Sequence, residues 1–273
     1  MSSESIDRPS SSASGFFPWR LFWLLLIAAV AGVGAAVPLL LEVFQPLISN
    51  NPEPLPLPLP IIIALGVAQN LVLLSVAIGV GLLVARKVGL GAPLLQAWLY
   101  GEQRRQSVRG SLGFGALVGI AVGVVVLVPL LIAAPHLPGL PLVSAARAAL
   151  WKRVIVGLYG GIVEEVLTRL FLLSLFAWLG TKIFRKYESG LSARVFWIAN
   201  IIAAILFGLG HLPSASMVMR ITPAVVAIAL ILNGIPAVTF GYLYWRRGLE
   251  SAMIAHFCAD FVLYAVGPVF LRA

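Results

Sequence analysis

Long apolar runs dominate this chain and limit the folds open to it. An α-helix needs about 20 consecutive apolar residues to cross a hydrocarbon core of ~30 Å. The sequence contains seven such candidate spans, at residues 21–41, 61–84, 112–134, 154–179, 195–211, 224–245 and 251–269. Since 60% of the 273 residues are hydrophobic and only 11% are charged, an ordinary soluble globular protein is excluded. The sequence predicts an all-α, polytopic transmembrane helix bundle.

The chain divides into a short tail and one membrane domain. Residues 1–15 are rich in Ser, and we predict that they are disordered. Residues 16–273 are predicted to form a single integral membrane domain. Residues 86–109 and 144–153 mix apolar with polar and basic side chains, which is typical of amphipathic helices at a membrane surface.

Three glycines are spaced four residues apart in the third predicted span. Gly115, Gly119 and Gly123 would form a smooth stripe on one face of a helix. Such a stripe lets a second helix approach closely, so we predict a role in helix packing and not in chemistry.

The net charge of +9 is explained by loops that alternate in their basic content. Thirteen Lys and Arg residues fall on one side of the predicted spans and five on the other, while Arg169 lies within a span. The more basic side is predicted to be cytoplasmic, which puts the N-terminus in the cytoplasm and the C-terminus outside. We therefore interpret the basic excess as an orientation signal and a contact with the lipid bilayer, and predict no nucleic-acid partner.

Three acidic residues lie inside apolar spans, and they mark the predicted functional site. Of the ten Asp and Glu residues, Glu164, Glu165 and Asp260 are in spans, and the other seven are in tails or loops. An ionisable side chain in the middle of a membrane helix costs roughly 3 kcal/mol on insertion scales, so such residues are functional candidates.

The first polar cluster pairs two glutamates with an arginine. On a helix, Glu165 and Arg169 share a face at i, i+4, whereas Glu164 projects about 100° away from its neighbour. We predict a buried ion pair between Glu165 and Arg169, with Glu164 facing a cavity as metal ligand or general base. Gly160 and Gly161 lie one turn earlier and would make room there for water or a peptide backbone.

Two histidine clusters complete the set of candidates. His211 follows Phe207 by four residues at the end of the fifth span, and His256 precedes Asp260 by four in the seventh. Imidazole nitrogens and carboxylates are zinc ligands, and two His with one or two carboxylates suffice for a catalytic site with a position left for water. His136 lies in a Pro-rich loop outside these clusters.

Each cluster also has a purely structural interpretation. An intramembrane His is more often a hydrogen-bonded packing residue than a ligand, and a Glu-Arg pair more often stabilises a helix. The functional interpretation rests on the coincidence that three separate helices each carry a polar cluster that is energetically unfavourable in a membrane. It also requires tilted or shifted helices, because His211 is predicted near the outer end of its span, His256 near the inner end and Glu164 in the middle.

At these residues the chain resembles the CPBP family of intramembrane metalloproteases, which includes CAAX prenyl endopeptidases and bacteriocin-processing enzymes. The family pattern is Glu-Glu-x-x-x-Arg, then Phe-x-x-x-His, then His-x-x-x-Asn/Asp on successive core helices. All three motifs occur in this order within residues 151–273, the predicted CPBP-like catalytic core.

The resemblance implies roles for individual residues. It implies that Glu164 and His211 activate a water, and that His256 and Asp260 help to hold a metal or stabilise the oxyanion. Glu164, His211 and His256 would be the ligands of a divalent metal, with zinc the first candidate, if the family's chemistry uses one. The structural residues of the motifs are Glu165, Arg169 and Phe207.

The leading functional prediction is an intramembrane endopeptidase. It would hydrolyse a peptide bond in a membrane-embedded or prenylated substrate, such as a prenylated C-terminus, a bacteriocin leader or a membrane-protein regulator. A non-catalytic immunity or scaffold protein in the membrane is one alternative. A proton- or cation-coupled transporter is another, because membrane carboxylates and histidines also form relays.

Overall fold

The structure, a computed structural model, describes residues 16–49, 57–101, 107–133, 145–184, 191–217 and 219–271. In these ranges the chain is helical and contains no strand. The predicted disorder of residues 1–15 and the loop with His136 lie outside the described residues.

The helices follow the apolar runs. The first half of the chain forms α1 (Trp19–Ser49), α2 (Leu59–Ala85), η1 (Arg86–Val88), α3 (Pro93–Tyr100) and α4 (Val108–Ala133). The second half forms α6 (Leu150–Ile155), η3 (Tyr159–Glu164), η4 (Val166–Leu173), α7 (Ser174–Phe184), α8 (Ala193–Gly210), α9 (Leu212–Ser216), α10 (Pro223–Arg247), α11 (Leu249–Asp260), η5 (Phe261–Val266) and α12 (Gly267–Leu271).

Local sequence signals set several of the helix ends. The Ser192 hydroxyl accepts a hydrogen bond from Val195 N at the start of α8, and Thr222 accepts one from Val225 N at the start of α10. Gly248 ends α10 with a φ of 96°, a left-handed value that favours glycine, and the chain turns there directly into α11.

Six helices in the described ranges are long and apolar enough to cross a membrane, and they correspond to six of the predicted spans. The exception is the fourth predicted span, residues 154–179. It is part of a helical rod that runs from α6 through η3 and η4 to α7. This rod contains Glu164, Glu165 and Arg169, and its π-helical turns interrupt the regular α-helix. The protein is a polytopic helical membrane protein, as predicted.

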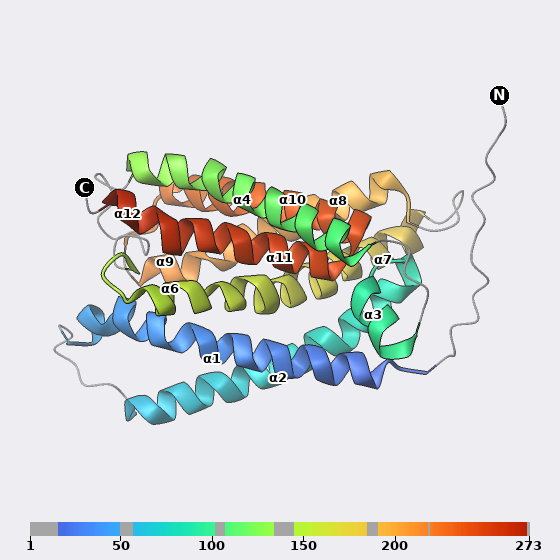
Figure 1. The fold of residues 1–273 in the computed structure, drawn as a ribbon, viewed down its shortest axis with the longest axis horizontal. Coiled ribbons are helices and arrows are strands. Elements are labelled where there is room, and N and C mark those ends of the chain that lie inside the picture. Colours follow the sequence, from blue (N-terminus) through green and yellow to red (C-terminus); the bar gives the residue numbers. More distant parts are fainter. Residues whose placement is uncertain are drawn as a thin grey trace.

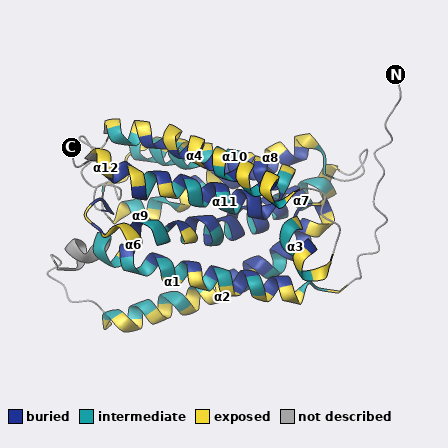
Figure 2. Ribbon diagram, in the orientation of Figure 1, coloured by how far each residue is buried: buried dark blue, intermediate teal, exposed yellow. Residues whose placement is uncertain are grey.

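The helices lie side by side as a bundle, with the catalytic candidates on inner elements. Figure 1 shows the α6–α7 rod between α1 and α2 on one side and α11 on the other, with α4, α8 and α10 beyond α11. Burial is strongest along this rod and α11, while α2 and α4 carry many exposed residues on their outer faces (Figure 2). The candidate site is thus held by the best-packed part of the molecule.

The glycine stripe of α4 packs against α11, as predicted. A Cβ added at Gly115 would lie 2.6 Å from the carbonyl oxygen of Ser251, and one at Gly123 would lie 3.0 Å from the Cα of Ala259. Gly119 meets the backbone of Ala255 even more closely. Because the two helices touch through their backbones, α4 fixes the position of the helix that carries His256 and Asp260.

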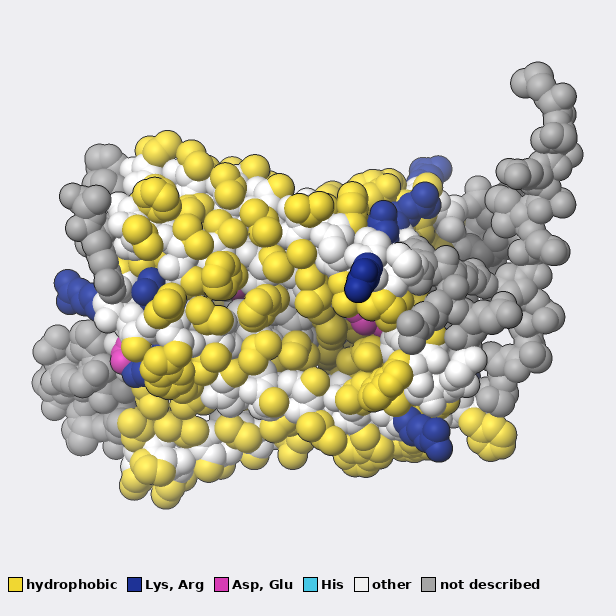
Figure 3. Space-filling view, in the orientation of Figure 1, with side chains coloured by type: hydrophobic (Ala, Val, Ile, Leu, Met, Phe, Trp, Pro, Cys, Tyr) yellow, Lys and Arg dark blue, Asp and Glu magenta, His cyan; other side chains and the backbone are white. Residues whose placement is uncertain are grey.

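The surface of the bundle agrees with a membrane setting. On the face shown in Figure 3, Lys and Arg lie towards the two ends of the bundle, and hydrophobic side chains cover the region between them. Exposed apolar side chains of this kind suit contact with lipid. α1 begins at one end of the bundle and α12 ends at the other (Figure 1), so the chain crosses the bundle an odd number of times. Which end is cytoplasmic stays a prediction.

Candidate active site

The predicted ion pair between Glu165 and Arg169 is present in the fully buried centre of the rod. Arg169 Nε lies 3.0 Å from Glu165 Oε2, and the two side chains are 2% and 0% exposed. Arg169 also donates from Nη1 to Thr168 Oγ1 at 2.6 Å and from Nη2 to the carbonyl of Ala237 in α10 at 3.2 Å. These contacts anchor the rod to α10 and keep the guanidinium paired, which a buried charge requires.

Two aromatic rings enclose the Arg169 guanidinium. Its centre lies 5.5 Å from the Phe207 ring and 5.7 Å from the Phe240 ring. Such cation–π contacts stabilise a desolvated cation. Phe207 therefore contributes packing around the ion pair, in addition to its backbone contact with His211 described below.

Glu165 has a second partner that its helical spacing does not predict. Its Oε1 lies 2.7 Å from His256 Nδ1 on α11. Paired with Arg169, Glu165 is a carboxylate and only accepts, so the imidazole carries a hydrogen on Nδ1. A connected row of side chains thus runs from Arg169 through Glu165 to His256. It fixes the orientation of the His256 ring and directs Nε2 towards Glu164.

Glu164 lies between the two histidines. Its Oε2 is 3.4 Å from His256 Nε2, and its Oε1 is 3.8 Å from His211 Nε2. The Glu164 side chain is 20% exposed and that of His211 is 37% exposed, whereas that of His256 is 8% exposed. The three groups meet at one place despite their different predicted depths, and the site is accessible on the side of His211.

His211 is oriented by the end of its own helix. Its Nδ1 lies 2.8 Å from the carbonyl oxygen of Phe207, four residues earlier in α8. A carbonyl oxygen only accepts, so Nδ1 carries the hydrogen and Nε2 presents a lone pair towards Glu164. A separation of 3.8 Å is too long for a direct hydrogen bond, but one water can contact both groups.

Asp260 stands at the edge of this group. Its Oδ1 is 3.9 Å from His256 Nε2, one helical turn along α11. The backbone of Gly160 lies directly beside it: a Cβ at Gly160 would collide with Asp260 Oδ2 and lie 3.0 Å from His256 Nε2. Gly160 is thus the residue that allows α11 to bring His256 and Asp260 next to the rod.

The expected role of the glycines needs correction on this point. Gly160 and Gly161 were predicted to leave room for water or a peptide backbone. Side chains of α11 fill the room beside Gly160, where His256 and Asp260 lie. Gly161 packs against Phe257, at 3.1 Å from an added Cβ, but it also lines an apolar cavity, so space does adjoin this glycine. The reason is that the two helices cross closely here, which single-helix spacing does not reveal.

The two histidines present some of the features of a metal site. Each histidine has its Nδ1 held by an acceptor and its Nε2 free, as is common for metal-bound imidazoles. Across the described ranges, however, no group of three or more His, Cys, Asp and Glu residues is arranged to hold a metal. Glu164 lies 3.4 Å from His256 Nε2 and 3.8 Å from His211 Nε2, and zinc at these three residues stays a prediction.

Comparison with known proteins gives a family match, and it covers the segment that contains the site. Residues 145–262 match the family model for type II CAAX prenyl endopeptidase Rce1-like proteins. This match agrees with the resemblance to the CPBP and CAAX protease family that the three motifs indicate. The matched segment contains Glu164, His211, His256 and Asp260, and the match supports CAAX-type intramembrane protease activity in general. Comparison with curated proteins and with solved structures gave no match.

Proposed function

We propose that this protein is an intramembrane endopeptidase in which Glu164 and His211 activate a water for attack on a peptide bond. The observation that carries the proposal is the position of Glu164, with one carboxylate oxygen facing each histidine at 3.8 Å and 3.4 Å. A carboxylate that is partly accessible and faces two imidazoles can remove a proton from a water held beside it. The proposed substrate is a membrane-associated peptide or a protein with a lipidated end.

The water would sit between Glu164 and His211. His211 Nε2 accepts one of its hydrogens, while Glu164 Oε1 takes the other as the oxygen attacks the carbonyl carbon. The proton on Glu164 then passes to the leaving nitrogen when the C–N bond breaks. One water is consumed, and the products are a carboxylic acid and an amine, which become a carboxylate and an ammonium group when the acid passes its proton to the amine.

His256 is proposed to act on the carbonyl oxygen. Its Nδ1 hydrogen is already engaged by Glu165, so a proton on Nε2 makes the ring a donor towards the negative charge that develops on this oxygen. Asp260 lies 3.9 Å from the same nitrogen and helps to hold that proton in place. Glu165 and Arg169 are positioning residues, since they act through His256 and touch no substrate.

Comparing newly formed peptide termini in membranes tests this function. Membranes that contain the wild-type protein should yield cut termini that are missing from membranes with Glu164→Gln at equal protein level. The same termini in both samples would overturn the protease proposal. A set found only with the wild type would also identify the substrate class.

Replacing Gly160 with alanine is expected to lower cleavage about 100-fold, because the added methyl displaces Asp260 and His256 from Glu164. The matched control is Gly113→Ala in α4, where an added Cβ meets no atom within 4 Å. Initial cleavage rates at equal folded protein measure the effect. Wild-type activity in Gly160→Ala would show that the close contact of the two helices is not needed.

Metal chelation tests the zinc ion predicted at Glu164, His211 and His256. Its removal is expected to lower the cleavage rate by at least about tenfold, because a zinc ion held there would polarise the water or the peptide carbonyl. The measurement compares rates before and after dialysis against a zinc chelator, with zinc content followed in parallel. A rate that stays within about twofold of the original after zinc has been removed would contradict the predicted zinc site.

A further inference from the structure

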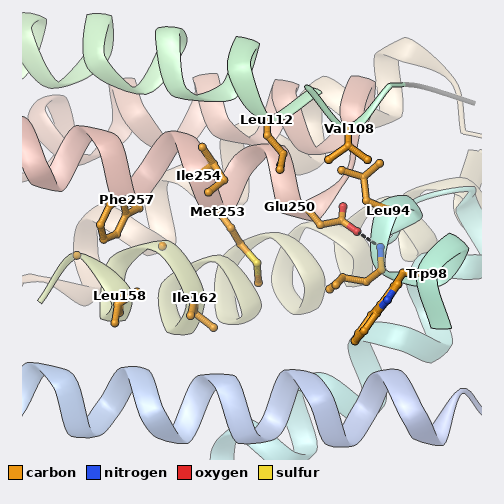
Figure 4. A pocket seen from close by; sticks show the side chains of 13 residues that line it. Leu94, Trp98, Val108, Leu112, Leu158, Ile162, Glu250, Met253, Ile254 and Phe257 are labelled. Atoms are coloured by element: carbon orange, nitrogen blue, oxygen red, sulfur yellow. Dashed lines mark hydrogen bonds between the residues drawn. The ribbon is translucent and has the colours of Figure 1, made fainter. Parts of the chain in front are cut away.

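An apolar cavity of about 590 Å³ lies beside the candidate active site but does not include it. It is bounded by α3, α4, the rod and α11 (Figure 4), and none of Glu164, His211, His256 and Asp260 lines it. Its walls are almost entirely hydrophobic, with Trp98, Leu112, Met253 and Phe257 among them. Its volume falls in the range of pockets that hold small ligands.

One carboxylate lines this cavity, and one of its two oxygen atoms has no hydrogen-bond partner. Glu250 is 7% exposed, and its Oε1 accepts a hydrogen bond from Leu95 N at 2.7 Å. Its Oε2 is buried and has no hydrogen-bond partner. The backbone N–H groups of Leu94 and Glu250 also lie near the carboxylate, but neither makes a well-formed hydrogen bond to Oε2. A buried acceptor in this state is unfavourable, so the atom can accept from a further donor. Figure 4 shows Glu250 at the end of the cavity where Leu94 and Trp98 lie.

This end of the cavity also coincides with one end of the bundle. Glu250 is the second residue of α11, immediately after the basic C-terminus of α10 with Arg246 and Arg247. Trp98 is 64% exposed, and Trp is enriched where a membrane meets water. An amphiphile with its chain in the cavity and its head at Glu250 would therefore have the orientation of a lipid in the bilayer.

The charges at this end of the cavity suit a head group that carries one positive and one negative charge. Glu250 offers a negative acceptor inside the cavity. Arg109 is exposed and follows the cavity residue Val108 in α4. Arg247, the last residue of α10, lies 4.2 Å from the ring of Phe114, which is also in α4. An ammonium group meets the carboxylate, and a phosphate meets the arginines.

We propose that the cavity binds one acyl chain of a phospholipid with a primary ammonium head group, which donates a hydrogen bond to Glu250 Oε2. The bound lipid fills the space between α3, α4, the rod and α11. It is a lipid site separate from the catalytic residues. The inference does not depend on the proposed proteolysis.

Native mass spectrometry of the purified full-length protein tests this site. The protein is mixed with phosphatidylethanolamine and phosphatidylcholine of the same acyl chains, because the methylated amine of phosphatidylcholine has no hydrogen to donate. One phosphatidylethanolamine per chain should be retained about tenfold more tightly than phosphatidylcholine. Equal retention of the two lipids would overturn the proposal, and a water would then be the partner of Oε2.

Two variants separate the head-group contact from the chain contact. Glu250→Gln keeps an acceptor for Leu95 but places an amide NH₂ at the position of Oε2, so the preference for phosphatidylethanolamine should disappear. Met253→Trp fills the cavity and should remove the bound lipid. The matched control is Val266→Trp, a 37% exposed position outside the cavity, which should bind lipid like the wild type.

The variants also define the outcomes that contradict the proposal. If Glu250→Gln still preferred phosphatidylethanolamine, another group would be the one that binds the ammonium. Unchanged lipid retention in Met253→Trp would place the lipid elsewhere on the protein surface. Either result on its own rejects the assigned site, so failure of one variant to fold leaves the other as a test.

Discussion

Replacing Glu164 with glutamine is expected to lower cleavage by about 10⁴-fold, the upper range for loss of a general base, while the bundle stays folded. Glutamine keeps the size of the side chain but cannot take a proton from water. Glu164 Oε1 and Oε2 make no contact with either histidine shorter than 3.4 Å, so few structural interactions are lost. The free energy of unfolding should therefore change little.

The measurement is the initial cleavage rate of the substrate found by comparing peptide termini, together with thermal unfolding of both proteins. Glu42→Gln is the matched control, since Glu42, in the C-terminal part of α1, pairs with Lys152 and does not touch the site. Glu42→Gln should cleave like the wild type. A Glu164→Gln protein that cleaves at the wild-type rate would remove Glu164 from the mechanism.

Replacing Arg169 with alanine is expected to lower the free energy of unfolding by about 3–5 kcal/mol, because it leaves the carboxylate of Glu165 buried without its cation. Cleavage should fall as well, since Glu165 also holds His256 Nδ1. Denaturant unfolding in detergent measures the first effect, and the cleavage rate of the folded fraction measures the second.

A double variant separates stability from positioning at this pair. Glu165→Gln with Arg169→Met removes both buried charges, so stability should return close to that of the wild type. Cleavage should stay about 10–100-fold lower, because a neutral amide orients His256 less firmly than a carboxylate. If the double variant regained full activity, the pair would serve only folding. If Arg169→Ala were as stable as the wild type, the ion pair would contribute nothing measurable.

The sequence predicts those features that depend on spacing within one helix. The pair Glu165 and Arg169 is four residues apart, and the structure contains their ion pair at 3.0 Å. Gly115, Gly119 and Gly123 lie on one face of α4 and pack on α11. The apolar runs likewise predict the membrane helices, because each run alone is long enough to cross the bilayer.

Contacts between helices could not be predicted in this way. The bond between Glu165 and His256 joins residues 91 positions apart, and spacing within a helix says nothing about such a partner. Gly160 shows the same limit. A glycine beside polar residues indicates free space, but only the packing of α11 shows that His256 and Asp260 occupy that space.

The depth of the catalytic candidates also depended on tertiary structure. Counting 1.5 Å per residue along straight, upright helices separates Glu164, His211 and His256. The rod contains the π-helical turns η3 and η4, and a third, η5, follows directly after α11, so irregular turns lie next to the site. π-Helical turns often occur at functional sites, and no simple sequence pattern predicts them.

The central claim is that Glu164 and His211 act together on one water, and a double-mutant cycle on the cleavage rate tests it most directly. Glu164→Gln and His211→Ala are measured singly and combined, at equal folded protein. If both groups hold the same water, the combined variant should be no slower than the slower single variant, because either change already removes the activated water. Losses that multiply in the double variant would show that the two residues act independently and would contradict the account.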